Sequence, residues 1–310
     1  MMQRTTFPLL VVASMLLAGC RPTQPQGGGG YYGPTQTMAQ VVEDINRNNS
    51  KVPTLWANHA YEANIYDEHK NKHFVSGRGV LLYSRPTSVR LIGTKEIVGT
   101  IFEIGSNPES YWLKLGPDAG DTMWWGTYAD LAHVNPDRIG IPIRPDLVLD
   151  VLGISTINTN FNELPVPTMR FNNDFRVYMF IWNAKMPDRW VAQREVWYDM
   201  NTKLPRYVFL FDTNGRVVLR GTLSAHKQVP VPGLPREQWP WVPGNYVLFF
   251  PESQSQIVFT LDEIALTRKQ EGPTGREVTV PNPQSFRMPD PDNAGVSRVN
   301  RIGPENAGGQ

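Results

Sequence analysis

The sequence predicts a mainly β (α+β) protein, an incompletely closed antiparallel β-barrel of about 11–12 strands with two or three helices covering its mouth. Aromatic residues make up 11% of the 310 residues and include nine Trp, whereas charged residues make up only 19%. This balance is typical of sheets with broad buried or half-buried faces. The 27 Pro and 26 Gly indicate many turns. Short apolar runs with the period of a strand recur from Trp56 to Leu266.

The charge balance and the single cysteine exclude several classes of protein. Thirty basic residues face 29 acidic ones, for a formal net charge of +1, which gives no electrostatic footprint for nucleic acid. One cysteine excludes a disulfide framework and a cysteine-based zinc site.

The first residues have the pattern of an export signal. Arg4 precedes an apolar run from Phe7 to Leu17. As a helix this run would rise about 16 Å, far short of the roughly 30 Å hydrocarbon core of a bilayer. The tetrad Leu17-Ala18-Gly19-Cys20 resembles the lipobox of bacterial lipoproteins. That resemblance implies a signal peptide over 1–19, cleavage before Cys20 and acylation of Cys20, with 20–30 as a flexible tether. A plain secretory signal with an incidental cysteine is the alternative.

The first half of the mature chain predicts one helix and then a meander of strands. Met38, Val41, Val42 and Ile45 repeat at helical spacing after Thr37, a candidate N-cap. Short turns separate the strands that follow, so neighbouring strands are expected to pair antiparallel. These strands are expected over 59–66, 77–83, 88–93, 98–104, 110–115 and 122–125.

The second half repeats this order. A helix is expected over 145–152, with Pro145 at its start and Gly153 after it. Asp212-Thr-Asn-Gly215 is a strong hairpin turn. Strands are expected over 175–182, 190–199, 206–211, 217–225, 246–250 and 257–266. One domain therefore covers 31–268, and the Pro- and Gly-rich residues 269–310 are expected to form a disordered tail.

Several strands carry apolar residues on both faces. Val177, Met179 and Ile181 point to one side, while Tyr178, Phe180 and Trp182 point to the other. Two interpretations remain open: a barrel or sandwich packed with its own side chains, and a curved half-barrel whose interior accepts an apolar ligand.

The order of motifs resembles the LolA/LolB-like lipoprotein-carrier superfamily. The motifs are Gln40-Val-Val-Glu-Asp-Ile45, Ser76-Gly-Arg-Gly79 leading to Arg85-Pro86, Gly99-Thr-Ile-Phe102, and a closing strand over 257–266. The resemblance implies a half-open antiparallel barrel that binds lipoprotein acyl chains in an apolar concavity, without a cofactor. The expected localisation is the cell envelope, as a lipid-anchored monomer on the outer membrane facing the periplasm.

The inferred lining of that concavity is Trp56, Leu81, Tyr83, Ile101, Leu113, Trp125, Met179 and Phe209. Two other functions remain open, a structural or scaffolding envelope lipoprotein and a hydrolase that uses paired carboxylates. We expect a non-enzyme, because no nucleophile elbow, P-loop or dinucleotide fingerprint is present.

The remaining candidates for chemistry favour structural roles. His69 and His73 lie in an expected hairpin turn, and Asp290 to Gly295 lacks the later ligands of a calcium loop, so no metal site is expected. Glu103 is expected to face water, since carboxylates are rarely buried. The alternative is a buried acid paired with Arg78 or Arg90. Trp239-Pro-Trp241 is expected to belong to a proline-stiffened loop capping one end of the barrel. An exposed aromatic clamp for lipid or sugar is the alternative.

Overall fold

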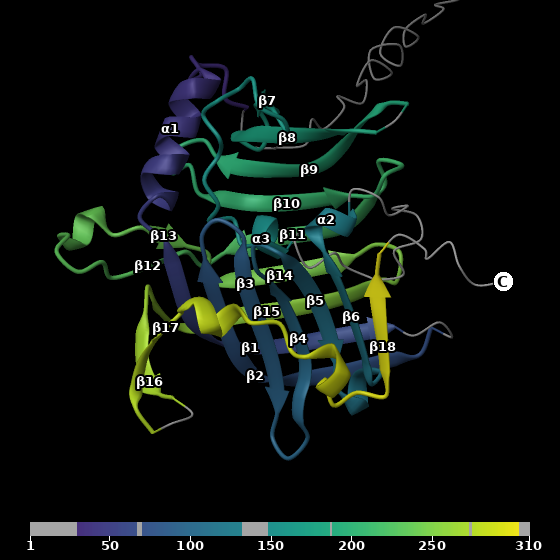
Figure 1. Cartoon of the computed structure of the whole chain (residues 1–310). Helices are drawn as coiled ribbons and strands as arrows, with labels where there is room; N and C mark the ends of the chain where they lie inside the picture. Colours follow the sequence, from purple (N-terminus) through teal and green to yellow (C-terminus); the bar gives the residue numbers. More distant parts are fainter. Residues whose placement is uncertain (1–29, 67–69, 132–147, 187, 273–274, 304–310) are drawn as a thin grey trace, which may run out of the picture.

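The computed structural model describes residues 30–66, 70–131, 148–186, 188–272 and 275–303. Its centre is one open sheet of 14 strands in the order β18-β6-β5-β4-β3-β2-β1-β15-β14-β11-β10-β9-β8-β7 (Figure 1). The strands of the first half are β1 Thr54–Tyr66, β2 Lys72–Ser84, β3 Ser88–Lys95, β4 Gly99–Ser106, β5 Ser110–Leu115 and β6 Thr122–Thr127. Those of the second half are β7 Pro167–Asn172, β8 Val177–Lys185, β9 Trp190–Asp199, β10 Pro205–Phe211, β11 Val217–Ser224, β14 Asn245–Phe250 and β15 Ser255–Ala265.

The expected strands are confirmed, with shifts of a few residues at their ends. Expected 110–115 and 190–199 coincide with β5 and β9. β7 and four short strands of two small sheets were not expected: β12 Lys227–Gln228 with β13 Trp241–Val242, and β16 Arg268–Glu271 with β17 Glu277–Val280. Nor was β18 Arg298–Ile302 expected.

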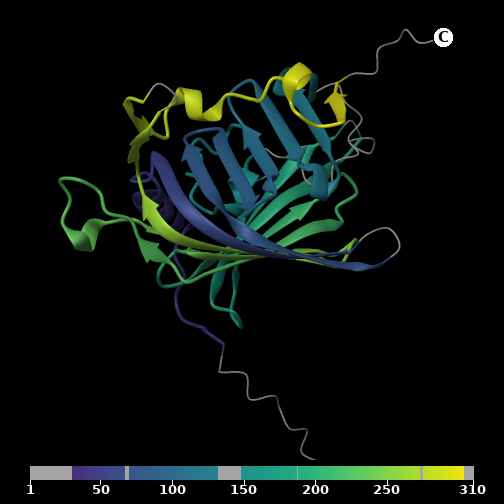
Figure 2. The same ribbon diagram turned by 90° about the horizontal axis from the view of Figure 1, so that it is seen from below.

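The sheet bends where β1, the first strand, meets β15. β1 pairs antiparallel with β15, from Trp56 opposite Ala265 to Asn64 opposite Gln256. The two edges of the sheet are β18, which pairs with β6, and β7, so the barrel is open between β18 and β7. Figure 2 shows β2–β6 and β7–β11 on two sides of this bend, so the sheet has a concave and a convex face.

The helix α1, Met38–Asn49, forms as the spacing predicts. Thr37 accepts a hydrogen bond from the Gln40 backbone, and the Gln40 side chain closes a capping box. Val41, Val42 and Ile45 are buried. The other two helices are short, α2 Tyr128–Leu131 and α3 Val148–Val151. Of the second expected helix, 145–152, the first three residues lie outside the described ranges.

One core fills the concave face. It joins the buried side of α1 and residues 148–157 to inward-facing side chains from both halves of the sheet, including Leu81, Tyr83, Phe180, Leu210 and Phe259. Several strands carry apolar residues on both faces. On the concave side, these residues pack against other side chains of the same chain.

The prediction of a disordered tail over 269–310 is wrong for the part of it that the structure describes. The C-terminal segment, residues 268–302, forms β16, β17, two 3-10 turns at Pro283–Phe286 and Pro291–Asn293, and β18. Val280 and Phe286 pack with Trp56 and Leu82. Ala294 packs with Trp112 and Met123, and β18 pairs parallel with β6. The segment covers the convex face of β2–β6 (Figure 2).

The expectation that Glu103 faces water is also wrong. Glu103 is 6% exposed and accepts hydrogen bonds from Arg90 Nε at 3.0 Å and Trp112 Nε1 at 2.9 Å. It lies on the convex face, which would be exposed to solvent without the C-terminal segment. Arg90 in turn donates to the Ser285 carbonyl of that segment at 3.1 Å. The alternative, a buried acid paired with Arg90, is the correct one.

Candidate functional site

The concave face holds a cluster of rings at the bend of the sheet. Tyr61 lies 5.1 Å from Phe102 and Phe102 lies 6.2 Å from Phe259, measured between ring centroids. His59 lies 5.5 Å from Phe259. Edge-to-face contacts at these separations add stability beyond the buried area. The cluster makes this part of the interior tightly packed.

Two glycines make room for those rings. A Cβ on Gly79 would lie 2.6 Å from His59 Nε2, and a Cβ on Gly93 would lie 2.2 Å from the Phe102 ring. Close approach therefore explains Gly79 within β2.

The environment of the ring cluster shifts the pKa of its histidine, His59. It is 1% exposed, and its Nε2–H donates to the Ile92 carbonyl at 3.0 Å. Burial lowers the pKa of His59 to about 4, although this hydrogen bond favours the protonated ring. The imidazole is therefore neutral in the folded protein at pH 7.

Asparagine side chains attach α1 to the rest of the domain. Asn46 donates to the Ile157 carbonyl and accepts from the Ile157 amide, both at 2.8 Å. Asn49 donates to the Ser155 carbonyl at 2.8 Å. Asn48 makes the same two-way contact with the backbone of Trp241 at 2.8 Å. These bonds hold the C-terminal half of α1 over the concave face. The last pair attaches Trp241 of the Trp239-Pro-Trp241 loop to the end of α1.

A buried ion pair attaches α3 to β9, in the second half of the sheet. Arg194 of β9 pairs with Asp150 of α3, and its guanidinium lies 4.2 Å from the centroid of the Trp182 ring. Burial lowers the pKa of Arg194 to about 10, so the group stays charged at pH 7. Removing one partner of such a pair leaves an uncompensated buried charge. The pair therefore holds α3 firmly in the core of the concave face.

A groove opens beside α1, where the helix meets residues 159–161. Its volume is about 470 Å³, within the range of about 300–1,000 Å³ typical of small-molecule pockets. Val42, Ala39 and Phe161 give it apolar walls. Its polar lining residues are Glu43, Asn46, Arg47, Ser50 and Thr159. Arg47 and Glu43 are exposed at its rim, and apolar walls with a charged rim suit an amphipathic ligand.

A second, smaller hollow lies near His59. It has a volume of about 250 Å³ and is lined by Asn58, His59, Arg78, Gly79, Asp262 and Glu263. Asn58 Nδ2 donates to Glu263 at 3.2 Å. Its lining is mostly charged or polar, so it does not suit a hydrocarbon chain.

The structure does not bring the eight predicted lining residues together. Leu81, Tyr83 and Leu113 share the concave side by register, and Leu81 and Tyr83 belong to the large core. Four others lie on the convex side. Trp56 and Trp125 pack under the C-terminal segment, and Met179 and Phe209 lie on the second half of the sheet. Ile101 is buried at an irregularity in the pairing of β3 with β4 and belongs to none of the core clusters of the described residues. None of the eight lines the groove.

Phe161, Thr159 and Arg47 are groove residues that sequence reasoning missed. Residues 153–166 have no apolar period, and their position over α1 depends on the Asn46–Ile157 contact. The helical spacing of Val42 signalled a buried face but did not indicate that a hollow adjoins it.

Within the described ranges, no three His, Cys, Asp or Glu side chains gather in a way that would hold a metal ion. His69 lies outside those ranges. Asp290 accepts from the Asp292 amide at 3.1 Å and so caps a 3-10 turn. In the same part of the chain, no helix is long and apolar enough to cross a bilayer.

No protein-family model matches the chain, and no curated protein matches it. Among solved structures, a Vibrio parahaemolyticus domain described as an outer membrane lipoprotein-sorting protein is similar, with 10% identity and a TM-score of 0.48 over 80% of this chain and 95% of that one. A LolA superfamily protein from Nitrosomonas europaea has 11% identity and a TM-score of 0.46 over 82% and 99%. A DUF1329 family protein from Desulfovibrio piger has 9% identity and a TM-score of 0.45 over 74% and 93%. The first two are proteins of the kind that the sequence pattern resembles.

Proposed function

We propose that this protein is an envelope lipoprotein, held through acylated Cys20 at the outer membrane and facing the periplasm, that binds an acyl chain without catalysis. The observation that carries the proposal is the groove of about 470 Å³ beside α1, which adjoins the apolar core of the half-barrel through Val42.

Apolar area supplies the binding energy in this proposal. Burying some 300 Å² of acyl chain at about 25 cal/mol per Å² contributes on the order of 7 kcal/mol before ordering costs. The groove's rim adds a cation, Arg47, and a carboxylate, Glu43, which are 3.5 Å apart. A polar headgroup would remain at this rim while the chain occupies the apolar side.

The position of α1 limits how far the acyl chain reaches. Val41, Val42 and Ile45 occupy the concave face, so a chain longer than the groove enters the core only when α1 shifts. The Asn46 and Asn49 contacts with 155–157 oppose that shift. In this mechanism these two asparagines set the balance between a filled interior and a ligand-bound one.

Native mass spectrometry and lipid extraction of the chain purified from envelopes test the proposal. Thr159→Trp places a large ring in the groove, and Thr279→Trp is the matched control on exposed β17. We expect lipid on the wild type and on the control but not on Thr159→Trp. A wild-type chain that carries no lipid would refute acyl-chain binding.

Membrane attachment is tested separately. We expect Cys20→Ser to move the protein from the membrane fraction to the soluble fraction without changing its fold. Continued membrane attachment of this variant would contradict anchoring through Cys20.

The filled concave face favours a second candidate, an envelope scaffold that uses the same fold for protein contacts. If Thr159→Trp abolishes lipid binding but retains every partner recovered from envelopes, the protein contacts do not depend on the groove, and scaffolding is the better description.

A further inference from the structure

The convex face of the second half of the sheet carries two rows of side chains that no described core covers. One row runs across the strands as Arg170, Met179, Trp197, Tyr207, Thr222, Val247 and Val258. The next is Thr168, Ile181, Glu195, Phe209, Arg220, Phe249 and Gln256. We call these two rows, together with Phe175 in the β7–β8 turn, the aromatic face.

The rings of the aromatic face contact one another instead of a core. Trp197 lies 5.5 Å from Phe175, 5.5 Å from Tyr207 and 5.4 Å from Phe209, between centroids. None of these rings belongs to, or packs against, the three core clusters of the described residues. Phe175 is 52% exposed. A large contiguous apolar patch of this kind marks an interaction site.

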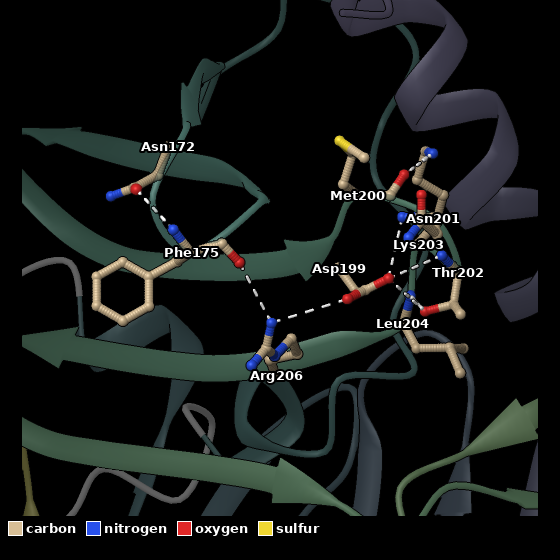
Figure 3. A network of polar contacts seen from close by, with 9 residues as sticks. All are labelled: Asn172, Phe175, Asp199, Met200, Asn201, Thr202, Lys203, Leu204 and Arg206. Atoms are coloured by element: carbon tan, nitrogen blue, oxygen red, sulfur yellow. Dashed lines mark hydrogen bonds and ion pairs between the residues drawn. The ribbon is translucent and has the colours of Figure 1, made fainter. Parts of the chain in front are cut away.

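Polar contacts fix Phe175 with its ring outward. Its amide donates to Asn172 Oδ1 at 3.1 Å, and its carbonyl accepts from Arg206 Nη1 at 3.3 Å. Figure 3 shows the ring pointing away from these contacts, which continue through Arg206 to Asp199. Because these bonds already hold the backbone of Phe175, contact between its ring and a partner requires no further ordering of the backbone there.

The charges of the aromatic face favour an anionic partner. Arg170 and Arg220 are exposed, and neither has a hydrogen bond or ion pair with any residue that the structure describes. Glu195 is the only carboxylate in the two rows, and it accepts from Trp197 Nε1 at 2.6 Å. Guanidinium groups beside aromatic rings suit phosphate groups at a membrane interface.

The N-terminal tether leaves the domain at the β7–β8 turn, on the sheet edge that separates the aromatic face from the concave face. The Tyr31 amide donates to the Asn173 carbonyl at 3.1 Å, and the Gln36 amide donates to Tyr178 Oη at 3.0 Å. Asn173 is two residues from Phe175. A Gly-rich linker of about 11 residues has an end-to-end distance of roughly 18 Å, so a lipid on Cys20 would keep the bilayer close to the aromatic face.

We propose that the aromatic face docks on the anionic surface of the membrane to which Cys20 is anchored. Trp197, Tyr207 and Phe209 lie at the headgroup level, and Arg170 and Arg220 contact lipid phosphates. The proposal rests on the anchoring part of the proposed function, and it is independent of acyl-chain binding in the groove.

The test uses the acylated mature chain, with Thr222→Cys on the aromatic face and Thr279→Cys, exposed on β17 of a separate small sheet, as the matched control. Each is reconstituted into phosphatidylcholine vesicles with about 30% phosphatidylglycerol, and its labelling rate with a water-soluble maleimide is compared with that in detergent micelles. We expect labelling at 222 to slow about tenfold in vesicles and labelling at 279 to stay unchanged. Arg170→Glu with Arg220→Glu is expected to restore labelling at 222.

The other outcomes overturn the proposal in recognisable ways. Equal labelling at 222 in vesicles and micelles refutes docking while leaving the anchor intact. Protection at 222 that rises with protein concentration, or that persists in micelles, assigns the face to a second copy. A chain that does not float with vesicles refutes the anchor itself, and docking with it.

Discussion

The two halves of the sheet carry the same two-faced pattern of apolar residues, yet their convex faces differ. On β1–β6 the C-terminal segment buries Trp56, Trp112 and Met123. On β7–β11, β14 and β15, no described core covers the rings of the aromatic face. We call these the covered half and the bare half. The difference shows that an apolar convex face is stabilised in one half by the chain itself and remains available for a partner in the other.

The largest expected difference between the halves comes from removing a ring. Phe286, 4% exposed, packs against the covered half, and Phe286→Ala is expected to lower the free energy of unfolding by about 3 kcal/mol. Phe209→Ala on the half-buried bare face is expected to cost about 1 kcal/mol. Chemical denaturation followed by tryptophan fluorescence measures both, and equal losses would contradict the distinction between the halves.

A matched pair of Glu–Trp hydrogen bonds sharpens the comparison. Glu103 and Glu195 each accept from an indole N–H, at 2.9 and 2.6 Å, but only Glu103 is buried and paired with an arginine. Glu103→Gln is expected to lower stability by about 2 kcal/mol because the charge on Arg90 loses its partner. Glu195→Gln is expected to cost less than about 1 kcal/mol. A reversed order of the two losses would show that burial does not decide their cost.

The stability of the protein is expected to depend on pH through His59, which lies on β1 where the two halves meet. His59 has a folded-state pKa of about 4, below its ordinary value of 6.5, so the unfolded chain takes up a proton before the folded one. Its contribution to stability is complete above pH 6.5 and is lost as the pH falls towards 4. From pH 7 to pH 5 the loss is about 2 kcal/mol.

His59→Phe keeps a ring against Gly79 and is expected to remove this part of the pH dependence. Burial also lowers the pKa of His226, but that group is unchanged in both chains, so the difference between them isolates His59. Denaturation curves at the two pH values that fall equally for wild type and variant would exclude this role.

The smallest effect is expected from the unpaired charge of the bare half. Arg220→Gln is expected to change stability by less than about 0.5 kcal/mol, whereas Arg90→Gln, which removes the partner of Glu103, is expected to cost about 2 kcal/mol. Thermal unfolding of the two variants checks this. A large loss from Arg220→Gln would mean that the aromatic face is stabilised from within.

The sequence was sufficient to predict α1 and most strands because their periods are local. The capping box at Thr37 and the hairpin turn at Asp212 depend on neighbouring residues. The C-terminal segment could not be found this way, since Val280, Phe286 and Ile302 are isolated apolar residues among Pro, Gly and Asn. Each is buried by a part of the sheet far away in the chain.

The same reason explains the errors at the candidate site. Where both faces of a strand are apolar, alternation identifies two sides but does not say which is concave. Met179 and Phe209 were therefore grouped with Leu81 and Tyr83, although they lie on opposite sides. The water-facing expectation for Glu103 failed because the cover over it comes from Ser285 and its neighbours.

The pairing of β1 with β15 has a consequence for how the molecule is made. Most other neighbours in the sheet are joined by short hairpins, but these two strands are separated by on the order of 200 residues, and such distant pairing is slow to form. During synthesis, the backbone N–H and C=O groups on one edge of β1 would lack hydrogen-bond partners until β15 is made. Such an edge can pair with another chain. Assembly of this protein is thus most vulnerable to aggregation just before β15 emerges.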